Sequence, residues 1–439
     1  MIWRAHQVLV AATVFAVPSL ASAQVVDRAV ARQIVERIAT SVEQNYLFAD
    51  TGRMVAEHLR ARMRAGAYDT VMEPGRLADR LSADMKATNG DLHLQAVYFA
   101  GQSQTPSGPQ MVRRRPGDPV PPDQLTQARR ANHNVRAADR LAGNVGYISI
   151  GELSARSEEA YRVVDAAMAF LERTDAMILD LRRTPGGTPR MSDYVASYFF
   201  GPDSVRTLSS YDRAMDQTFE RWTRPVPGKQ RPDIPVYVLV GPGTASGAED
   251  LAFTFKQSGR GILVGQKTAG AGRLTRIFPV GGGFAASVPG GRTWDPRTGK
   301  EWERVGIEPD LASAADDALT VAHAAALARL AATTTDTSWR RSLIWAREAE
   351  LARANPISVP AATLRQYAGT YDLRVIRFEN GKLWYHRTAG RAKEALTPVD
   401  DHAFALGEEV RVEFVRSGGR VTGMRVTAPG QASTFLKNP

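Results

Sequence analysis

The sequence contains no cysteine, and this absence excludes several kinds of chemistry. Disulfide frameworks, cysteine nucleophiles, iron–sulfur clusters and thiolate zinc sites all require that residue. Any catalytic nucleophile must therefore be an oxygen or a nitrogen atom. An exported protein can also lack cysteine when its hydrophobic core is large enough to be stable without cross-links.

Long hydrophobic runs are missing after Gln24, so no later segment is long enough to span a membrane. The single early run, residues 8–20, follows Arg4 and is short for a membrane span. It precedes Ala21-Ser22-Ala23, whose small side chains suit a signal peptidase. We predict a signal peptide over residues 1–23, cleavage after Ala23, and a periplasmic or secreted mature protein. A retained membrane anchor is the alternative interpretation.

The sequence also lacks a concentrated basic stripe, although its formal net charge is +10. Its densest basic run, residues 113–115, lies among Pro and Gly residues. Proteins that bind nucleic acid usually gather their positive charge on one face, so we expect no nucleic-acid partner. Neither a Gly-Lys-Ser/Thr pattern nor a strand–Gly-x-Gly-x-x-Gly–helix pattern is present. We therefore expect no nucleotide, no cofactor and no bound metal.

The length of 439 residues, with 43% hydrophobic and 23% charged residues, is that of a globular chain of several domains. Residues 24–100 have helical periodicity and predict an N-terminal helical domain. Residues 101–143 are rich in Gly and Pro and predict a linker. The stripe that defines the helical face consists of Ile34, Val35, Ile38, Val42 and Tyr46.

Residues 144–312 alternate apolar strands with helices, which predicts an α/β core. The continuous apolar run 236–240 indicates a sheet buried on both faces. Residues 277–294 resemble a hairpin, and residues 313–360 predict a helical connector. Short β-like runs separated by turn signals predict a small antiparallel β domain over residues 361–439. We expect its core to contain Phe378, Trp384, Tyr385 and Phe404.

Ser246 lies where a buried strand passes into a helix, in the segment Gly241-Pro242-Gly243-Thr244-Ala245-Ser246-Gly247. A serine on such a turn is exposed, and the unpaired N–H groups of the helix start can stabilise negative charge. These features suit a nucleophile. The alternative is that Ser246 only caps the helix.

A second glycine-rich turn, Asp180 to Gly187, follows another strand of the predicted sheet. The glycines Gly186 and Gly187 permit main-chain conformations that aim N–H groups at a ligand, as an oxyanion hole requires. Both glycine turns follow the carboxyl ends of sheet strands, where open α/β sheets bind ligands.

A serine nucleophile needs a base, and the position of each histidine narrows the choice. His93 lies beside a turn at the end of the helical domain, whereas the others fall in the signal, helices, connector or terminal β domain. Lysine is the other possible base when it is desolvated. Lys256 lies ten residues beyond Ser246 on the same helix, about 15 Å away, which excludes it. Lys267, at a strand end, remains an alternative.

Five segments occur in the order and approximate spacing of one serine peptidase family. They are Asn144-Val145-Gly146-Tyr147-Ile148, Asp180 to Gly187, Thr244-Ala245-Ser246-Gly247-Ala248-Glu249, Gly265-Gln266-Lys267-Thr268-Ala269-Gly270 and Gly306-Ile307-Glu308-Pro309-Asp310. Together, over residues 27 to 312, they resemble the tail-specific (C-terminal processing) serine peptidases, which include the tricorn core and the interphotoreceptor retinoid-binding protein repeats. The resemblance implies a ClpP/crotonase-like α/β core.

Two departures from the family pattern are informative. Ala271 occupies the position of the base lysine of tail-specific members, and an alanine side chain cannot accept a proton. The connector after His93 is also too short and too Pro-rich to hold the PDZ domain of those members. The chain is therefore similar to the branch without PDZ, represented by tricorn and the retinoid-binding repeats.

The resemblance to tricorn-like members implies roles for two further residues. A His in a segment similar to Gly90-Asp91-Leu92-His93 serves there as the base, and a Glu before the Gly-x-x-Pro-Asp motif orients it. In this sequence those residues are His93 and Glu303. Leu92 stands where tricorn has a serine, so the resemblance does not supply a fourth member of the relay.

The sequence therefore predicts an exported serine peptidase that acts on peptides or unfolded proteins. Ser246 is its predicted nucleophile, His93 its base and Glu303 its orienter, and N–H groups of Gly247 and of Gly186 or Gly187 form the oxyanion hole. The main alternative is a non-catalytic periplasmic protein that binds peptides or apolar ligands on the same fold. An esterase that uses the same residues on small acyl substrates is a third possibility.

Overall fold

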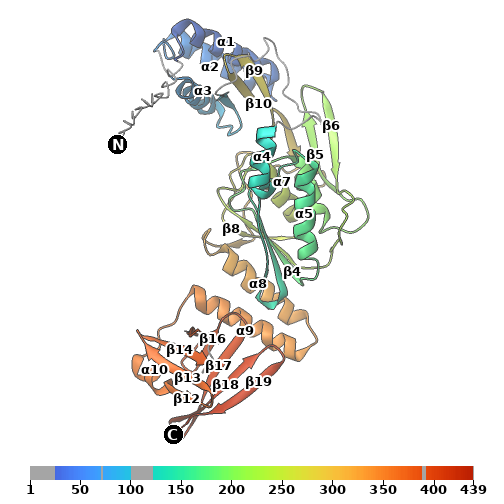
Figure 1. Ribbon diagram of the computed structural model, residues 1–439. Helices are drawn as coiled ribbons and strands as arrows, with labels where there is room; N and C mark the ends of the chain where they lie inside the picture. Colours follow the sequence, from blue (N-terminus) through green and yellow to red (C-terminus); the bar gives the residue numbers. More distant parts are fainter. Residues whose placement is uncertain (1–24, 71–72, 100–121, 388–391, 439) are drawn as a thin grey trace, which may run out of the picture.

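The computed structural model describes residues 25–70, 73–99, 122–387 and 392–438, arranged as an extended series of modules (Figure 1). The N-terminal helices, the α/β core and the C-terminal β domain follow one another in space as they do in sequence. The predicted signal peptide, 1–23, and the basic run 113–115 lie outside the described residues. Across those residues, none of the helices has the length and apolar character that a membrane span needs.

The N-terminal module is built from three helices and one short strand. The elements are α1 (Arg28–Asn45), α2 (Ala49–Arg64), α3 (Pro74–Asn89) and β1 (Gln95–Tyr98). Asp27 begins α1 as an N-cap, because its Oδ1 accepts a hydrogen bond of 2.8 Å from the Val30 N–H. The predicted stripe from Ile34 to Tyr46 is buried against the other helices, which confirms the helical periodicity.

A hairpin from the middle of the sequence completes this module. It consists of β9 (Arg273–Gly281) and β10 (Phe284–Trp294), and it corresponds to the hairpin predicted from the sequence. Its apolar side chains share one hydrophobic core with α1, α2 and α3. β10 also pairs with β1 and with β5 (Arg206–Asp212), which in turn pairs with β6 (Gln217–Trp222).

The central sheet of the α/β core has the order β11-β8-β7-β4-β3-β2. Its strands are β2 (Val135–Leu141), β3 (Val145–Ile150), β4 (Ala176–Asp180), β7 (Val236–Val240), β8 (Ile262–Gly265) and β11 (Leu311–Ala312). All are parallel to their neighbours except β2, which runs antiparallel to β3 at the edge.

Helices cover both faces of this sheet, as the continuous apolar strands predict. One face contacts α5 (Glu158–Phe170), α6 (Pro189–Ser197) and α7 (Gly247–Gln257), and the other contacts α8 (Ala318–Thr333) and α9 (Thr337–Ala354). Successive residues of β4 point to opposite faces of the sheet. Met177 packs in the core with α5, α6 and α7, and Ile178 packs in the core with α8 and α9.

The segment 101–143, predicted as a linker, contains regular structure in its second half. It forms α4 (Pro122–Arg130), the 3₁₀ turns η1 (Asn132–Asn134) and η2 (Ala142–Asn144), and β2. Because β2 pairs with β3, the core sheet begins before residue 144. The sequence does not predict β2, because most of its side chains are exposed at the sheet edge and the strand therefore has no apolar run.

The C-terminal module is a nearly closed antiparallel β barrel, in agreement with the predicted β domain. It starts with α10 (Ala361–Tyr367), and its strands pair in chain order from first to last. They are β12 (Gly369–Tyr371), β13 (Arg374–Glu379), β14 (Lys382–Arg387), β15 (Glu394–Pro398), β16 (Ala403–Leu406), β17 (Val410–Ser417), β18 (Arg420–Ala428) and β19 (Gln431–Leu436).

A bridge between Tyr371 and Lys437 brings the two ends of this barrel together. Of the aromatic residues expected in its core, Phe404 is buried, while Phe378 and Tyr385 are partly buried against the core. Trp384 is half-buried outside that cluster, and its Nε1 donates to the Glu379 carbonyl at 3.3 Å. The core prediction is therefore confirmed for three of these aromatic residues and wrong for Trp384.

Candidate active site

Ser246 lies in a strained turn between β7 and α7. Its φ of 51° and ψ of −121° fall where residues with a side chain rarely occur. An ordinary helix N-cap has extended backbone angles, so the capping role alone does not account for this geometry. Main-chain bonds fix the turn, since the Ser246 carbonyl accepts from the Asp250 N–H at 3.0 Å. A strained strand–turn–helix of this kind presents a side chain to solvent.

The carboxylate of Glu249 connects the Ser246 turn to the loop at Gly270 through hydrogen bonds. It is fully buried and accepts hydrogen bonds from the N–H groups of Ser246 at 3.0 Å, Gly270 at 2.7 Å and Ala271 at 2.7 Å. The Thr268 hydroxyl donates a fourth bond. Burial raises the pKa of Glu249, and these bonds oppose that shift because they favour the charged form.

The sequence reasoning assigned no role to Glu249, although a signal for it existed. A serine followed three residues later by glutamate is the pattern of a capping box, in which the glutamate reaches back to the main chain of the helix start. The bonds to Gly270 and Ala271 come from a loop more than 20 residues away in sequence, which no local pattern indicates.

Three glycines surround Ser246 with main chain. A Cβ atom on Gly186 would lie 2.8 Å from the Ser246 Cβ and 3.2 Å from the Gly247 nitrogen. A Cβ on Gly247 would lie 2.7 Å from the Gly187 carbonyl oxygen. Gly186 and Gly187 have φ values of 135° and 143°, which only glycine adopts readily. No larger residue fits at these positions without movement of the chain.

This arrangement brings the predicted oxyanion-hole residues together. Gly247 is the first residue of α7, so helix geometry leaves its N–H without a partner inside the helix. The Gly186 carbonyl accepts from the Leu153 N–H at 2.8 Å, which fixes the orientation of that turn. Within the described part of the chain, the N–H groups of Gly186 and Gly187 donate to no other group. They are available to a negatively charged oxygen.

His93 follows α3 in a turn that is anchored to α1. The Asp91 carboxylate accepts from the His93 main-chain N–H at 2.9 Å and from the Tyr46 hydroxyl at 2.8 Å. Asn89 also donates to the Tyr46 hydroxyl, at 2.8 Å. The imidazole Nδ1 is buried and has no hydrogen-bond partner among the described residues. Burial lowers the pKa of His93, which favours the neutral imidazole that a base requires.

Glu303 lies in the loop that meets the His93 turn. It is buried, and its Oε2 accepts from the Gly272 N–H at 2.7 Å. Burial, followed by repulsion from the Asp91 carboxylate, raises the pKa of Glu303 to about 7. A Cβ on Gly90 would lie 3.6 Å from the Arg304 guanidinium, so the two segments are in contact.

Hydrogen bonds do not connect the residues of the predicted relay in the described part of the chain. Within the described chain, none of these bonds joins His93 to Ser246, or Glu303 to His93. The assignment of His93 as base and Glu303 as orienter stays a prediction.

Lys267, the alternative base, is in a different environment. Its side chain is 53% exposed, and its Nζ forms an ion pair of 2.8 Å with Glu308. A lysine base is normally held in a desolvated pocket, whereas this side chain is exposed and paired with a carboxylate. Ala271, at the lysine position of the tail-specific members, is buried.

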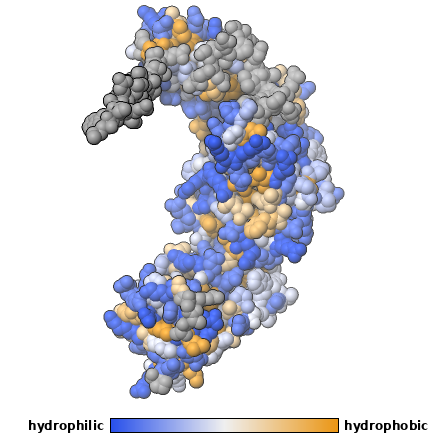
Figure 2. Space-filling model, viewed as in Figure 1, coloured by the Kyte–Doolittle hydropathy of each residue, from blue (hydrophilic) through white to orange (hydrophobic). Residues whose placement is uncertain are grey.

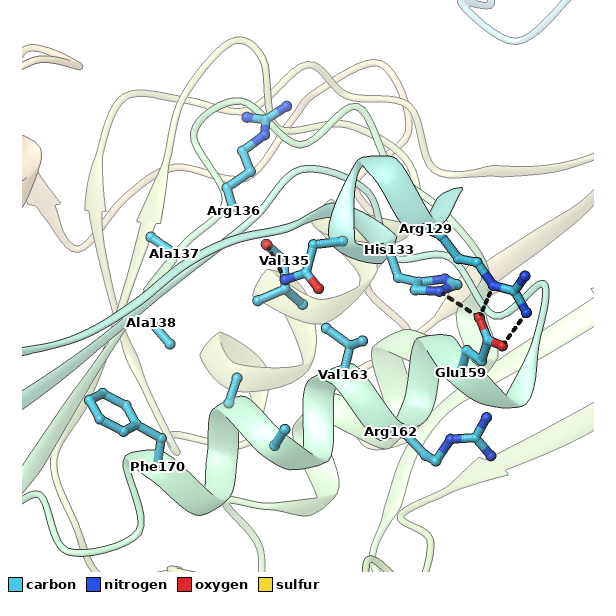
Figure 3. A pocket seen from close by; sticks show the side chains of 13 residues that line it. Arg129, His133, Val135, Arg136, Ala137, Ala138, Glu159, Arg162, Val163 and Phe170 are labelled. Carbon is cyan, nitrogen blue, oxygen red and sulfur yellow. Dashed lines mark hydrogen bonds and ion pairs between the residues drawn. The ribbon is translucent and has the colours of Figure 1, made fainter. Parts of the chain in front are cut away.

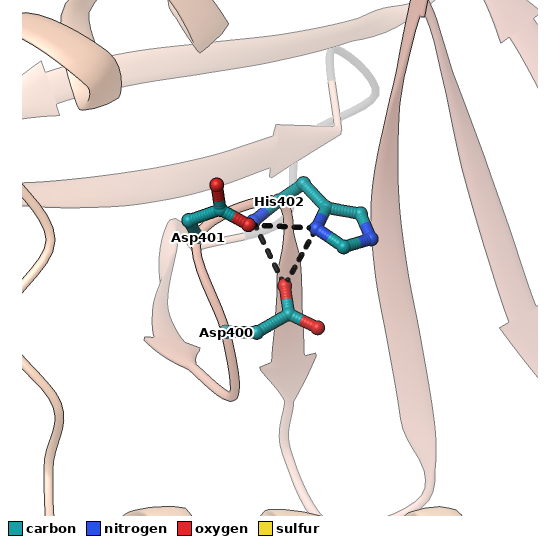
Figure 4. Close-up of side chains that lie close together, drawn as sticks. All are labelled: Asp400, Asp401 and His402. Carbon is teal, nitrogen blue, oxygen red and sulfur yellow. Dashed lines mark hydrogen bonds and ion pairs between the residues drawn. The ribbon is translucent and has the colours of Figure 1, made fainter.

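A group of possible metal ligands lies in the C-terminal module, in the turn between β15 and β16 (Figure 4). Asp400, Asp401 and His402 bring ligand atoms within 4.8 Å of one another. The Asp400 Oδ1 accepts from the main-chain N–H groups of His402 at 2.8 Å and Ala403 at 2.6 Å, as in an Asx turn. These bonds account for the cluster as a turn, and we assign no metal to it.

Two family models match the chain in succession. The model of peptidase family S41 matches residues 144–313. The model described as the N-terminal domain of peptidase S41 in eukaryotic IRBP matches residues 20–132. The first contains Ser246, the glycine turns and Glu303, and the second contains His93.

The chain is similar to two named relatives and, more distantly, to one solved structure. The carboxyl-terminal-processing protease of Synechocystis sp. is 32% identical over 173 residues, covering 39% of this chain and 38% of that protein. The chloroplastic carboxyl-terminal-processing peptidase 3 of Arabidopsis thaliana is 34% identical over 177 residues, covering 39% and 32%. A photosystem II D1 C-terminal processing protease structure matches 65% of this chain and 94% of its own, with 14% identity and a TM-score of 0.41.

The matched region therefore spans less than two fifths of these two relatives' own length. The order of the motifs, the two consecutive family models and the named relatives agree. The chain belongs to peptidase family S41 and carries that family's N-terminal domain.

Proposed function

We propose that the protein is an exported serine peptidase that cleaves peptides or unfolded proteins, with Ser246 as its nucleophile. The observation that carries the proposal is the strained Ser246 turn, packed against the main chain of Gly186, Gly187 and Gly247. A binding protein has no need of a strained serine beside free N–H groups.

In the proposed mechanism the Ser246 Oγ attacks the scissile carbonyl carbon. His93 takes the serine proton and later gives it to the leaving amine, while Glu303 orients the imidazole and stabilises its cation. The N–H groups of Gly247 and of Gly186 or Gly187 bind the oxyanion. One such donor typically contributes about 100-fold or more in rate.

The proposal requires His93 to move toward Ser246 before catalysis. His93 belongs to the N-terminal module and Ser246 to the α/β core, and no hydrogen bond between them occurs among the described residues. We infer that substrate binding draws the two modules together and forms the His93–Ser246 bond.

Hydrolysis of casein and of unfolded peptides by the purified mature protein tests the nucleophile. Ser246→Ala should abolish hydrolysis and labelling by a fluorophosphonate, whereas the control Ser342→Ala, on α9, should leave both unchanged. Hydrolysis or labelling that persists in Ser246→Ala contradicts the assignment.

Export belongs to the same proposal and has its own test. Expression of the full sequence in a Gram-negative host, followed by N-terminal sequencing of the periplasmic protein, should give a chain that begins at Gln24. A chain that retains residues 1–23 contradicts cleavage.

One observation favours a second candidate, a non-catalytic binder of peptides or apolar ligands. It is the missing hydrogen bond between His93 and Ser246 in the described structure. Such a binder would retain peptides at equilibrium without cleaving them, and it would not react with the fluorophosphonate.

A further inference from the structure

A groove of about 710 Å³ lies between the edge strand β2 and helix α5, outside the Ser246 turn (Figure 3). In the space-filling view, hydrophobic residues gather over this part of the core between hydrophilic ones (Figure 2). Residues of η1, β2 and α5 form most of its walls, and the end of α4 contributes Arg129.

One wall of the groove is an unpaired strand edge. β2 is the last strand of its sheet, and among the described residues only β3 pairs with it. Such an edge presents main-chain N–H and C=O groups that can pair with another chain. The small side chains of Ala137 and Ala138 line the groove beside this edge and leave room for an added strand. A bulge between Val135 and Ala137 separates Arg136 from the regular register.

The opposite wall is the apolar flank of α5. Val163, Ala166 and Phe170 line it at three- and four-residue steps, so they lie on one side of the helix. Phe170 is 64% exposed, which is unusual for a large aromatic side chain. The groove thus combines main-chain hydrogen-bonding groups on one side with apolar contact surface on the other.

The charged groups of the groove are unbalanced. Glu159 is neutralised within the groove, because Arg129 donates to both of its carboxylate oxygens at 2.8 and 2.6 Å and His133 lies 3.3 Å from it. Arg136 and Arg162 are exposed and have no ion pair within the described chain. Figure 3 shows these two guanidinium groups on opposite sides of the groove. Among the described residues, none neutralises the positive charge of Arg136 and Arg162 in the groove.

The end of the groove at η1 is rigidly built. Asn132, His133 and Asn134 all have positive φ values, and His133 is buried. Its contact with Glu159 ties this strained turn to the start of α5. The Arg136 side chain lies against Gly151 and reaches to 3.5 Å from the Arg183 carbonyl, in the turn that also contains Gly186. The Arg136 side chain thus connects this end of the groove with the glycine turn.

We propose that this groove binds an extended peptide segment with acidic side chains, which adds to β2 as a further strand. Main-chain bonds to β2 hold the segment, alternate side chains lie against Val163 and Phe170, and its carboxylates pair with Arg136 and Arg162. The site is separate from Ser246, so the inference does not depend on the proposed catalytic activity.

Binding is measured with the Ser246→Ala protein, which keeps the peptide intact in either case. The probe is a short fluorescent peptide in which Glu alternates with Val, followed by fluorescence anisotropy at low salt. We expect saturable binding that weakens about tenfold or more in Arg136→Glu and Arg162→Glu. The matched control, Arg347→Glu on the exposed side of α9, should bind as the parent does.

Two further measurements distinguish strand addition from simple charge attraction. Methylation of alternate amide nitrogens in the peptide removes its main-chain donors and should weaken binding about tenfold. Ala166→Trp fills the groove from α5 and should weaken binding without loss of folding, as checked by thermal unfolding. Bound peptide should slow hydrogen exchange in β2.

The inference is overturned by equal binding of a peptide in which Lys replaces Glu, or by full binding of the N-methylated peptide. It is also overturned if exchange slows only outside residues 135–141. None of these results bears on Ser246, whose role is decided separately by hydrolysis and labelling with the parent chain.

Discussion

The two halves of the candidate site are held in different ways. The Ser246 half is fixed by the four hydrogen bonds to Glu249 and by the close packing of glycine main chain. The His93 half has only its main chain anchored, through Asp91, and its imidazole has no partner in the described structure. In the proposed mechanism, this difference means that the nucleophile and oxyanion hole are preformed, whereas the base is completed when substrate binds.

The largest expected loss of activity comes from removing the imidazole of His93, the less constrained half of the candidate site. His93→Ala should lower kcat/KM for peptide hydrolysis by about 10³-fold or more, because the proposed mechanism transfers the serine proton to His93. Lys267→Ala should change kcat/KM by less than about threefold, since it removes only an exposed ion pair. The reverse outcome, with activity lost only in the lysine variant, would make Lys267 the base.

A methyl group added at Gly186, beside Ser246, should lower activity somewhat less. Gly186→Ala places a Cβ 2.8 Å from that of Ser246 and forces a φ near 135° on an alanine, so the oxyanion donors must shift. We expect kcat to fall about 100-fold while peptide binding changes little. Gly201→Ala is the matched control, because its added Cβ meets nothing within 4 Å. Wild-type kcat in Gly186→Ala would refute a rigid oxyanion hole.

Glu249→Gln tests what holds the nucleophile turn. The amide retains the shape of the carboxylate but accepts fewer of its hydrogen bonds, so the Ser246 turn and the loop at Gly270 should loosen. We expect a loss of about 1–3 kcal/mol in the free energy of unfolding and about tenfold in kcat. The exposed Glu57→Gln on α2 should change neither, as measured by urea unfolding and peptide hydrolysis. Unchanged stability in Glu249→Gln would mean that the four bonds do not support the turn.

The last effect on stability concerns the ionisation of Glu303 and appears only as a dependence on pH. Its folded-state pKa of about 7 exceeds its ordinary value of 4.5, so the protonated form is favoured by folding. Its contribution to stability is full below pH 4.5 and is lost as the pH rises through 7, by at most about 3 kcal/mol. The stability of wild type relative to Glu303→Gln should therefore fall across that range in urea unfolding. A pH-independent difference would contradict the burial of an ionisable Glu303.

The ionisation of Glu303 should raise activity with increasing pH, whereas it lowers stability. An orienting carboxylate must be charged to stabilise the imidazolium, so kcat/KM should rise with pH through about 7. Glu303→Gln should remove this rise as well as lower the rate.

Much of the fold follows from the sequence because its signals are local. The continuous apolar run 236–240 and the strand–turn–helix around Ser246 each depend on neighbours in sequence, and both appear as predicted. The stripe of α1 is likewise local. Local patterns alone were therefore enough to predict the α/β core, the helical module and the position of Ser246 between a strand and a helix.

The features that the sequence did not reveal depend on distant partners. β2 has an edge pattern in which only Val135 is buried, so it resembles a polar connector until its pairing with β3 is seen. The bonds from Glu249 to Gly270 and Ala271 cross between elements, as does the contact between the Gly90 turn and Arg304. Periodicity contains no information about such contacts.

The path of the β9–β10 hairpin has a mechanical consequence. The chain leaves the core after the loop that Glu249 holds, packs both hairpin strands into the N-terminal module, and returns to the core just before Glu303. The module that carries His93 is thus connected to the core at both ends of one hairpin, once at the loop that Glu249 holds and once next to Glu303. A displacement of that module pulls on both loops together, so His93, Glu303 and the loop held by Glu249 respond to one motion.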